Sequence, residues 1–570
     1  MDKRFFLALV LTMGVIFVTP RLFPGPPRPV TPIAAADSTG RADTTAVGRS
    51  TGPAAPVMTA APSVGPAAAP AGAPQVLPPA RTARLAHALA TYEFSSRGAA
   101  FLRAELPRHR RLGGEAAPVE LRDGTRPLVH YRILAGGDTI PLDAIDFAAT
   151  ETADATRPRV TFTAPVGAGQ VAITYTLSPS RYVTDLEVAA TGLPAPSYLL
   201  IDLPESFESQ EKDSLDDRRH LAYAMRTMAG GAERIDFRKP DPGERLVRQG
   251  PFTWAVAKNK YFLVGVLTAD STDSPLAEVQ VTGAPRQDRV ATRAHGTVVT
   301  RLASVPVRLE LYAGPQEWEG LVAMGREFEH VNPYGGWLNS VVQPFATIVM
   351  RVLLWMKRST ALSYGWILVI FGVGIRLLLW PLNSRAMRSQ MVMQRIAPLV
   401  QAAQAEAKAK HPTDLQKQQA MVMKVYADAG VSPFAPLAGC LPMLLPMPVL
   451  FALFFVFQNT IEFRGVPFLW FPDISVADPL YIAPLLTGGS MFLLSWLSMR
   501  NSPPNPQTKM LAWMMPLMMT VFGIRFAAGL NLYWFVQNFA AMPQQWMIAN
   551  ERAKLTPAPA PADAGERKRR

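Results

Sequence analysis

Residues 363–382 read SYGWILVIFGVGIRLLLWPL. These 20 residues are long enough to cross the hydrocarbon core of a bilayer as a helix, and Arg376 is the one charge among them. An arginine inside a membrane helix costs about 2.5–3.5 kcal/mol on insertion scales, so it has to face water, a partner or a functional cavity. The simpler interpretation is that Arg376 extends to the nearby membrane interface. The stretch therefore predicts a transmembrane helix that carries one candidate functional residue.

The composition of the whole chain favours a protein that is partly embedded in a membrane. Of the 570 residues, 49% are apolar and 18% are charged, whereas soluble globular proteins have about 25% charged residues. The 57 basic and 44 acidic residues give a net charge of +13, which favours anionic partners such as lipid headgroups or RNA. The single cysteine, Cys440, excludes an intramolecular disulfide and a thiolate metal cage. This composition argues against a purely cytosolic enzyme.

The first 82 residues predict a membrane anchor followed by a linker. Residues 1–23 place Lys3 and Arg4 before an apolar run, which is typical of a signal peptide or an uncleaved transmembrane anchor. Small residues suited to cleavage lie at 34–36, far from this run, so we expect an uncleaved anchor that starts in the cytoplasm. Residues 24–82 contain no aromatic residue and are rich in Ala, Pro and Gly, so we expect a disordered periplasmic linker.

Residues 83–330 predict a β-sandwich domain. Apolar and polar residues alternate in stretches such as 171–177 (VAITYTL), and Gly, Pro, Asp and Ser separate these stretches at short intervals. The domain contains no metal-ligand spacing, nucleophile motif or phosphate-binding loop, so we expect no catalytic residue, no metal and no cofactor. One group of charged residues is expected to form a solvated loop rather than a site: Asp213, Asp216, Asp217, Arg218 and Arg219.

The chain after residue 330 predicts a helical membrane core. We expect an interfacial amphipathic helix (331–362), transmembrane helix 2 (363–382), a cytoplasmic helical hairpin (383–430), transmembrane helices 3–6 (431–549) and a basic cytoplasmic tail (550–570). The competing interpretation of the first segment is a full span, which would disturb the distribution of basic loops. With six spans and both termini in the cytoplasm, every basic loop lies on one side of the membrane.

Several polar side chains fall within the predicted spans. Gln537 and Asn538 lie in the last span, and together with Arg376 they could line one hydrated groove. Each amide taken alone is more typical of packing between membrane helices. No carboxylate lies deep in a predicted span, which argues against a proton-coupled pump.

At this point the chain resembles the Gram-negative form of the YidC family of membrane protein insertases. The resemblance covers essentially the whole chain and is carried by Tyr364-Gly-Trp366 with Arg376 and Pro381-Leu382, Gly439-Cys440-Leu-Pro442, Met447-Pro448, Asp473-Ile474, and Gly529 to Trp534 with Asn538. It implies that residues 83–330 are the periplasmic β-supersandwich of this family. It also implies an insertase and chaperone, not an enzyme, with a groove open to cytoplasm and lipid.

The resemblance assigns roles to individual residues. Arg376 would be the positive charge of the groove and would transiently receive the acidic N-terminal tail of a substrate. The apolar part of the substrate would pass along a contact line made of Pro442, Met447, Phe451, Tyr533 and Trp534. The hairpin would recruit substrates or ribosomes through basic residues that include Arg385, Arg388, Arg395, Lys408 and Lys410. Two positions depart from the family pattern: Pro446, where some relatives carry glutamine, and Arg525.

The implied partners are nascent membrane proteins, the ribosome, the Sec translocon and anionic lipids. Two other functions remain open on the sequence alone. One is a small-solute or ion transporter, against which the lack of buried carboxylates counts. The other is a structural envelope module whose β domain binds a periplasmic partner.

Overall fold

The structure is a computed structural model of the 570-residue chain, and it describes residues 79–553 apart from 153, 155, 270–275, 287–290, 304, 333, 335–338, 413, 431–446 and 500–505. The predicted anchor, nearly all of the linker, the start of the third span and most of the basic tail lie outside these residues. The chain divides into two compact units, Met1–Ala60 with Pro503–Met515, and Ala61–Ser502 with Pro516–Arg570. Apart from residues 506–515, all the described residues belong to the second unit.

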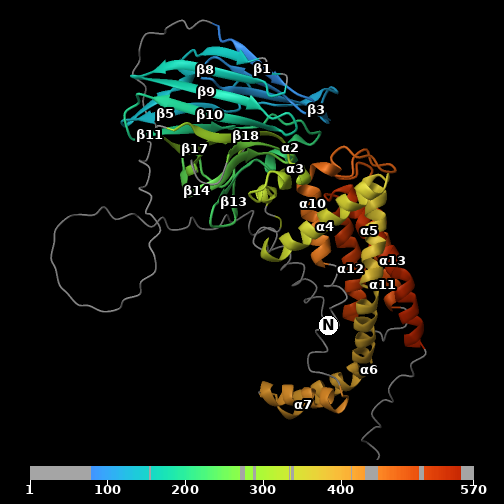
Figure 1. Cartoon of the computed structure of the whole chain (residues 1–570). Helices are drawn as coiled ribbons and strands as arrows, with labels where there is room; N and C mark the ends of the chain where they lie inside the picture. Colours follow the sequence, from blue (N-terminus) through green and yellow to red (C-terminus); the bar gives the residue numbers. More distant parts are fainter. Residues whose placement is uncertain are drawn as a thin grey trace, which may run out of the picture. The chain divides into compact units, whose positions relative to one another are not determined.

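Two antiparallel sheets form a β-rich domain, as predicted (Figure 1). The smaller sheet has the order β1-β2-β3-β4, with β1 (Thr82–Ala86), β2 (Thr91–Ser95), β3 (Phe101–Arg110) and β4 (Pro118–Leu121). The larger sheet has 14 strands in the order β6-β5-β11-β17-β16-β14-β15-β18-β10-β9-β8-β7, with β12 paired to β14 and β13 paired to β12. Its strands are β5 (His130–Ala135), β6 (Asp138–Pro141), β7 (Ala148–Thr152), β8 (Arg159–Val166), β9 (Gly169–Leu177), β10 (Val183–Thr191), β11 (Ser197–Leu203), β12 (Ala222–Thr227), β13 (Ala232–Asp236), β14 (Arg245–Lys258), β15 (Phe262–Thr268), β16 (Leu276–Gly283), β17 (Ala294–Leu302) and β18 (Val307–Pro315).

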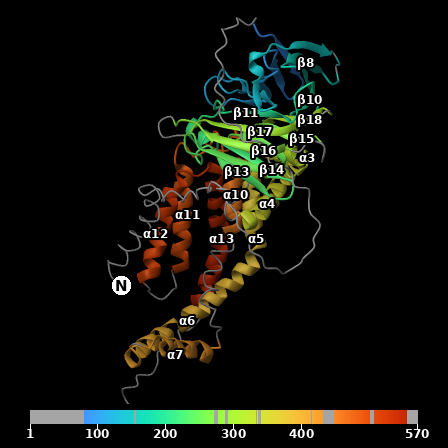
Figure 2. The same ribbon diagram turned by 90° about the vertical axis from the view of Figure 1, so that its left-hand side faces the viewer.

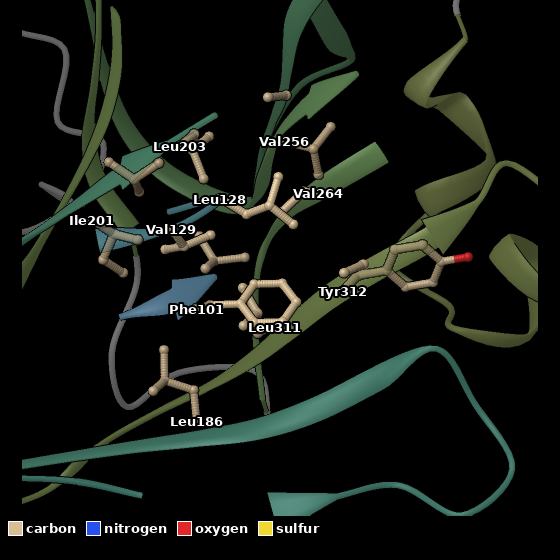
Figure 3. Packing of buried hydrophobic residues seen from close by; sticks show 14 of the residues in the cluster. Phe101, Leu128, Val129, Leu186, Ile201, Leu203, Val256, Val264, Leu311 and Tyr312 are labelled. Carbon is tan, nitrogen blue, oxygen red and sulfur yellow. The ribbon is translucent and has the colours of Figure 1, made fainter. Parts of the chain in front are cut away.

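The two sheets share one hydrophobic core. In β9, Val171, Ile173 and Tyr175 alternate with more exposed neighbours and are fully buried, as expected for a strand with one face toward a core. Figure 3 shows Phe101 of β3 beside Leu311 of β18, and both belong to the same cluster of buried side chains. This shared core makes the domain a sandwich, because neither sheet could bury its apolar face alone.

The rest of the described chain is helical. Its elements are α4 (Asn339–Ser359), α5 (Tyr364–Leu378), α6 (Trp380–Lys410), α7 (Leu415–Asp428), α10 (Met447–Asn459), η4 (Ile461–Phe463), α11 (Ile482–Met499), α12 (Pro506–Gly523) and α13 (Ala528–Ala553). Short helices α2 (Ser214–Arg219), α3 (Trp318–Ala323), η1 (Leu142–Ala144) and η2 (Phe328–Val331) belong to the preceding part of the chain. A second hydrophobic cluster joins α4, α5, α10 and α13, and both ribbon views show α5 beside α13 (Figures 1 and 2).

The helix bounds differ from the predicted spans at one informative place. The helix predicted over 363–382 ends at Leu378, and α6 begins at Trp380 and continues to Lys410. Pro381 is tolerated because it lies in the first turn of α6, where a backbone N–H has no helical partner. Among the described residues, α11 is both long and apolar enough to cross a membrane, whereas α5 and parts of α10 and α12 are apolar but shorter.

The predicted break between two helices near residue 410 is present. Helix α6 ends at Lys410, and α7 begins at Leu415 after Asp414, whose side chain accepts a hydrogen bond from the backbone N–H of Lys417 at 3.1 Å. The two helices pack against each other (Figure 2). The location of this pair in the cytoplasm stays a prediction.

The expectation of a solvated loop was wrong for Asp217 and for the backbone, which is helical, although Asp213, Arg218 and Arg219 are exposed. Asp217 lies in α2, is 2% exposed and accepts a hydrogen bond from the backbone N–H of Lys260 at 3.2 Å. Asp216 pairs with the Lys260 ammonium at 2.8 Å. Asp217 is buried because a partner 43 residues away satisfies its carboxylate, which local sequence cannot reveal, whereas the side chain of Asp216 is 35% exposed.

Loop residues after α10 contact the β-rich domain through buried polar groups. The Arg464 guanidinium pairs with Glu211 at 2.7 Å, and their side chains are only 5% and 8% exposed. Arg464 also donates to the carbonyl oxygen of Arg110 at 2.9 Å. Burial raises the pKa of Glu211 to about 7, although Arg464 opposes this shift. The hydroxyl of Tyr261 donates to Ser475 at 3.1 Å in the same region.

Glu462 in η4 has the most unusual environment of this loop. Its Oε1 accepts a hydrogen bond from the backbone N–H of Trp318 at 2.9 Å, while its Oε2 is buried without a partner. No cation pairs with Glu462 among the residues that the structure describes. Burial raises the pKa of Glu462 to about 7, from an ordinary value of 4.5.

We expect Glu462 to lower the free energy of unfolding of the protein as the pH rises. Between the ordinary pKa of 4.5 and the raised value near 7, the folded protein binds more protons at this group than the unfolded chain does. The stabilising contribution is therefore complete below pH 4.5 and lost by about pH 7, with an upper limit of about 3 kcal/mol. Thermal unfolding of the purified chain at pH 5 and pH 8 measures this, and Glu462→Gln should reduce the difference. The exposed Glu151→Gln on β7 is the control, and an unchanged pH dependence in Glu462→Gln would contradict the expectation.

Close contact between α5 and α13 gives a second prediction. A Cβ atom at Gly372 would lie 3.1 Å from Cγ1 of Val536 and 3.5 Å from Cδ2 of Tyr533, whereas a Cβ at Gly374 would meet nothing within 4 Å. Gly372→Val should therefore overpack the contact and destabilise the protein by about 1–3 kcal/mol. Gly374→Val on the same helix is the matched control. Thermal unfolding in lipid nanodiscs compares them, and equal losses in both variants would be evidence against this packing.

Candidate functional site

Arg376 lies in the last turn of α5 and is largely enclosed by its neighbours. Arg376 is 9% exposed, and its Nη2 donates a hydrogen bond to Oε1 of Gln544 at 2.9 Å. Its Nε is buried without a partner. Within the described residues no carboxylate forms an ion pair with Arg376. The structure thus holds a buried positive charge against a neutral amide.

Gln544 on α13 connects Arg376 to the start of α6. Its Nε2 donates to the carbonyl oxygen of Trp380 at 3.0 Å and to Oγ of Ser384 at 2.7 Å. Gln544 is 1% exposed. Sequence reasoning missed it, although Gln544 follows Gln537 by seven residues and therefore lies on the same face of the helix.

Gln537 makes the second polar contact between the same helices. Its Nε2 donates to the carbonyl oxygen of Gly372 at 2.8 Å and to the hydroxyl of Tyr533 at 3.1 Å. Tyr533 is 2% exposed, and its ring centroid lies 6.0 Å from that of Phe371. We call Arg376, Tyr533, Gln537 and Gln544 the α5–α13 seam, because their side chains meet between these two helices.

The structure places Asn538 in a different contact. Its Nδ2 donates to Oγ of Ser490 on α11 at 3.1 Å, and Ser490 donates to the carbonyl oxygen of Thr487 at 2.8 Å. Consecutive residues of a helix point about 100° apart, so Gln537 and Asn538 cannot both face α5. Asn538 is therefore part of the α11–α13 contact and not of the seam around Arg376.

The residues of the predicted contact line differ in accessibility. Phe451 on α10 is 41% exposed, Trp534 is half-buried and Tyr533 is enclosed in the seam. Met447 is the first residue of α10, but its side chain is outside the described part, as are Pro442, Pro446 and Cys440 entirely. An apolar segment could reach Phe451 from outside the helices, whereas reaching Tyr533 requires α5 and α13 to separate.

The predicted recruitment residues all lie on α6. Arg385 and Lys408 are exposed, and the side chain of Arg395 is not described. Arg388 pairs with Glu551 of α13 at 3.0 Å, and Lys410 pairs with Glu406 at 2.6 Å. Arg525, which follows α12, is also exposed. Arg385 and Lys408 therefore present positive charge to solvent or to an anionic partner, whereas Arg388 and Lys410 are paired with carboxylates.

The chemistry available at the seam is hydrogen bonding to an anion. The guanidinium offers up to five N–H donors in a planar fork, a geometry suited to a carboxylate. Among the described residues, no group of three or more His, Cys, Asp or Glu side chains could hold a metal ion.

Two family models match the chain. The model described as YidC periplasmic domain matches residues 84–348, and the model described as 60Kd inner membrane protein matches residues 355–555. The membrane protein insertase YidC of Bordetella avium is 30% identical over 483 residues, which cover 81% of this chain and 82% of that protein. That of Chlorobaculum tepidum is 28% identical over 494 residues, which cover 82% of this chain and 81% of that protein.

A solved structure of an active YidC insertase also matches, with 17% identity, a TM-score of 0.32 and coverage of 82% of this chain and 92% of that one. The assignment to a family does not depend on it. Sequence identity of 30% over more than two thirds of both proteins is sufficient, and the two family models match successive parts of the chain. This chain belongs to the YidC family of membrane protein insertases.

Proposed function

We propose that this protein is an inner-membrane insertase and chaperone that moves hydrophilic tails of nascent membrane proteins across the membrane and releases their apolar segments into lipid. The observation that carries this proposal is Arg376, a buried guanidinium with a neutral partner and an unpartnered Nε. An uncompensated charge between apolar helices is costly and is expected where it has a function. The names of the relatives, membrane protein insertase YidC, support the same activity.

The mechanism is a lowered barrier to partitioning. A polar tail must give up its hydration to enter the hydrocarbon core, which costs several kcal/mol for each unsatisfied group. A groove with polar side chains and a guanidinium replaces part of that hydration for an acidic tail. The free energy of the overall reaction comes from burying the apolar segment of the substrate in lipid.

The exit of the apolar segment is proposed to follow the contact line. Phe451 and Trp534 lie where an apolar chain can approach from outside the helices, and Pro442 and Met447 precede Phe451 in the sequence. Because Tyr533 is enclosed with Gln537 in the seam, an apolar segment that reaches Tyr533 must separate this contact. Asn538 supports α13 from the side of α11 in this proposal.

The family assignment implies an inner-membrane protein with a periplasmic domain. We propose six spans with both termini in the cytoplasm, an interfacial α4, and a cytoplasmic pair of helices α6 and α7. The basic side chains Arg385, Arg388, Arg395, Lys408 and Lys410 would then face the compartment where ribosomes and anionic headgroups occur. The protein would act on nascent chains alone or beside the Sec translocon.

An insertion assay tests the role of Arg376. Proteoliposomes that contain the full chain should insert a single-span substrate with an acidic tail faster than the same substrate with a neutral tail. Arg376→Gln should reduce this preference about tenfold or more, because hydrogen bonds to charged groups contribute about 1.5–3 kcal/mol. The protease-protected fraction of substrate measures insertion.

The matched control is Arg525→Gln, which removes an exposed arginine near the end of α12. This control should retain the preference for acidic tails. If Arg376→Gln inserted both substrates at the rates of the unmodified protein, Arg376 would not receive the tail.

A further inference from the structure

We propose that Gln544 is a positioning residue for Arg376. Its amide holds the guanidinium against the first turn of α6 without neutralising the charge, so that Arg376 stays available for a substrate carboxylate. This inference rests on the proposed function, and it adds a residue 168 positions away from Arg376 in the sequence.

The hydrogen bonds of Gln544 fix the orientation of its amide. Both N–H bonds of Nε2 are directed to oxygen atoms, one on the backbone of Trp380 and one on the side chain of Ser384. Arg376 is a donor only, so the carbonyl oxygen Oε1 must face it. A flipped amide would bring N–H groups against the guanidinium and its oxygen against the carbonyl oxygen of Trp380, and would lose both of these contacts. One side chain on α13 thereby ties the end of α5 to the start of α6.

The neutrality of Gln544 matters as much as its geometry. A glutamate of the same length would form a buried ion pair with Arg376, which is stronger than a hydrogen bond to an amide. An incoming carboxylate would then have to compete with an internal one and would meet like-charge repulsion. A glutamine holds the guanidinium in position and leaves its charge uncompensated.

The end of α5 and the start of α6 also contain unpartnered polar atoms. Besides Nε of Arg376, both Nδ2 and Oδ1 of Asn383 are buried without a partner, and Asn383 is 1% exposed. Asn383 lies between the two residues of α6, Trp380 and Ser384, that Gln544 binds. Buried polar groups without partners are rare in folded proteins, and a polar ligand bound where α5 meets α6 would provide partners for those of Arg376 and Asn383.

The test compares Gln544→Glu and Gln544→Met with Gln545→Glu in the full chain, reconstituted in proteoliposomes. Gln545 is the adjacent residue on α13 and is half-buried, so its substitution introduces the same charge one residue away. Two single-span substrates that differ only in an acidic or a neutral tail are inserted in parallel. The readout is the ratio of their initial insertion rates.

We expect Gln544→Glu to lower the ratio of acidic to neutral insertion about tenfold, to the level of Arg376→Gln. Gln544→Met keeps the volume of the side chain but removes the tether, and it should lower the ratio as well, by less than Gln544→Glu. Gln545→Glu should keep the ratio of the unmodified protein. If the Gln544→Glu protein is not produced in sufficient amount, the Gln544→Met variant tests the positioning role, because methionine is a volume-conserving replacement.

The outcomes separate this inference from the proposed function. If Arg376→Gln loses the preference but both Gln544 variants retain it, the positioning role is overturned and the role of Arg376 stands. A loss of insertion that is equal for acidic and neutral tails in the Gln544 variants indicates a structural role alone and also overturns the inference. If Arg376→Gln itself keeps the preference, the proposed function of Arg376 fails first.

Discussion

The arrangement of the helices depends on how a guanidinium can be enclosed between apolar surfaces. Arg376 cannot lose its proton, so the surrounding helices must provide acceptors or the charge remains unsolvated. The structure provides one amide oxygen, from Gln544, and the remaining contacts of that amide join α5, α6 and α13. The helix is interrupted at Leu379, close to these contacts. The end of α5, the start of α6 and the Gln544 side chain therefore form one local unit.

The β-rich domain and the helical region have separate hydrophobic clusters, and they bury apolar side chains in different ways. The sandwich buries alternate residues of its strands between two sheets, and its core includes large side chains such as Trp254 and Tyr175. The helices place apolar residues such as Ile370 and Leu485 on their outer surface, which is expected where lipid replaces water as the surrounding medium. The polar groups of the helices are instead turned inward, in the α5–α13 seam and in the α11–α13 contact.

Sequence patterns predicted local structure well and side-chain partners poorly. Alternation located β9, and α11 lies within the stretch 431–549 where transmembrane helices 3–6 are predicted. Arg376 could be selected because a charge in an apolar run is a local signal. Gln544 was missed, because its spacing from Gln537 places both on one face of a helix but does not show that this face meets α5 and α6. Asp217 was assigned to solvent for the same reason, since the backbone of Lys260 that satisfies it lies 43 residues away.

The buried ion pair between Arg464 and Glu211 constrains the sequence evolution of this family. Loss of either side chain alone would leave the other charge enclosed without its partner, which costs about 3–5 kcal/mol, whereas replacing both by apolar residues can be neutral. The two positions are 253 residues apart and belong to different domains. They should therefore be substituted together among descendants of one ancestor, so that a β domain exchanged between distant relatives would bring a mismatched charge with it.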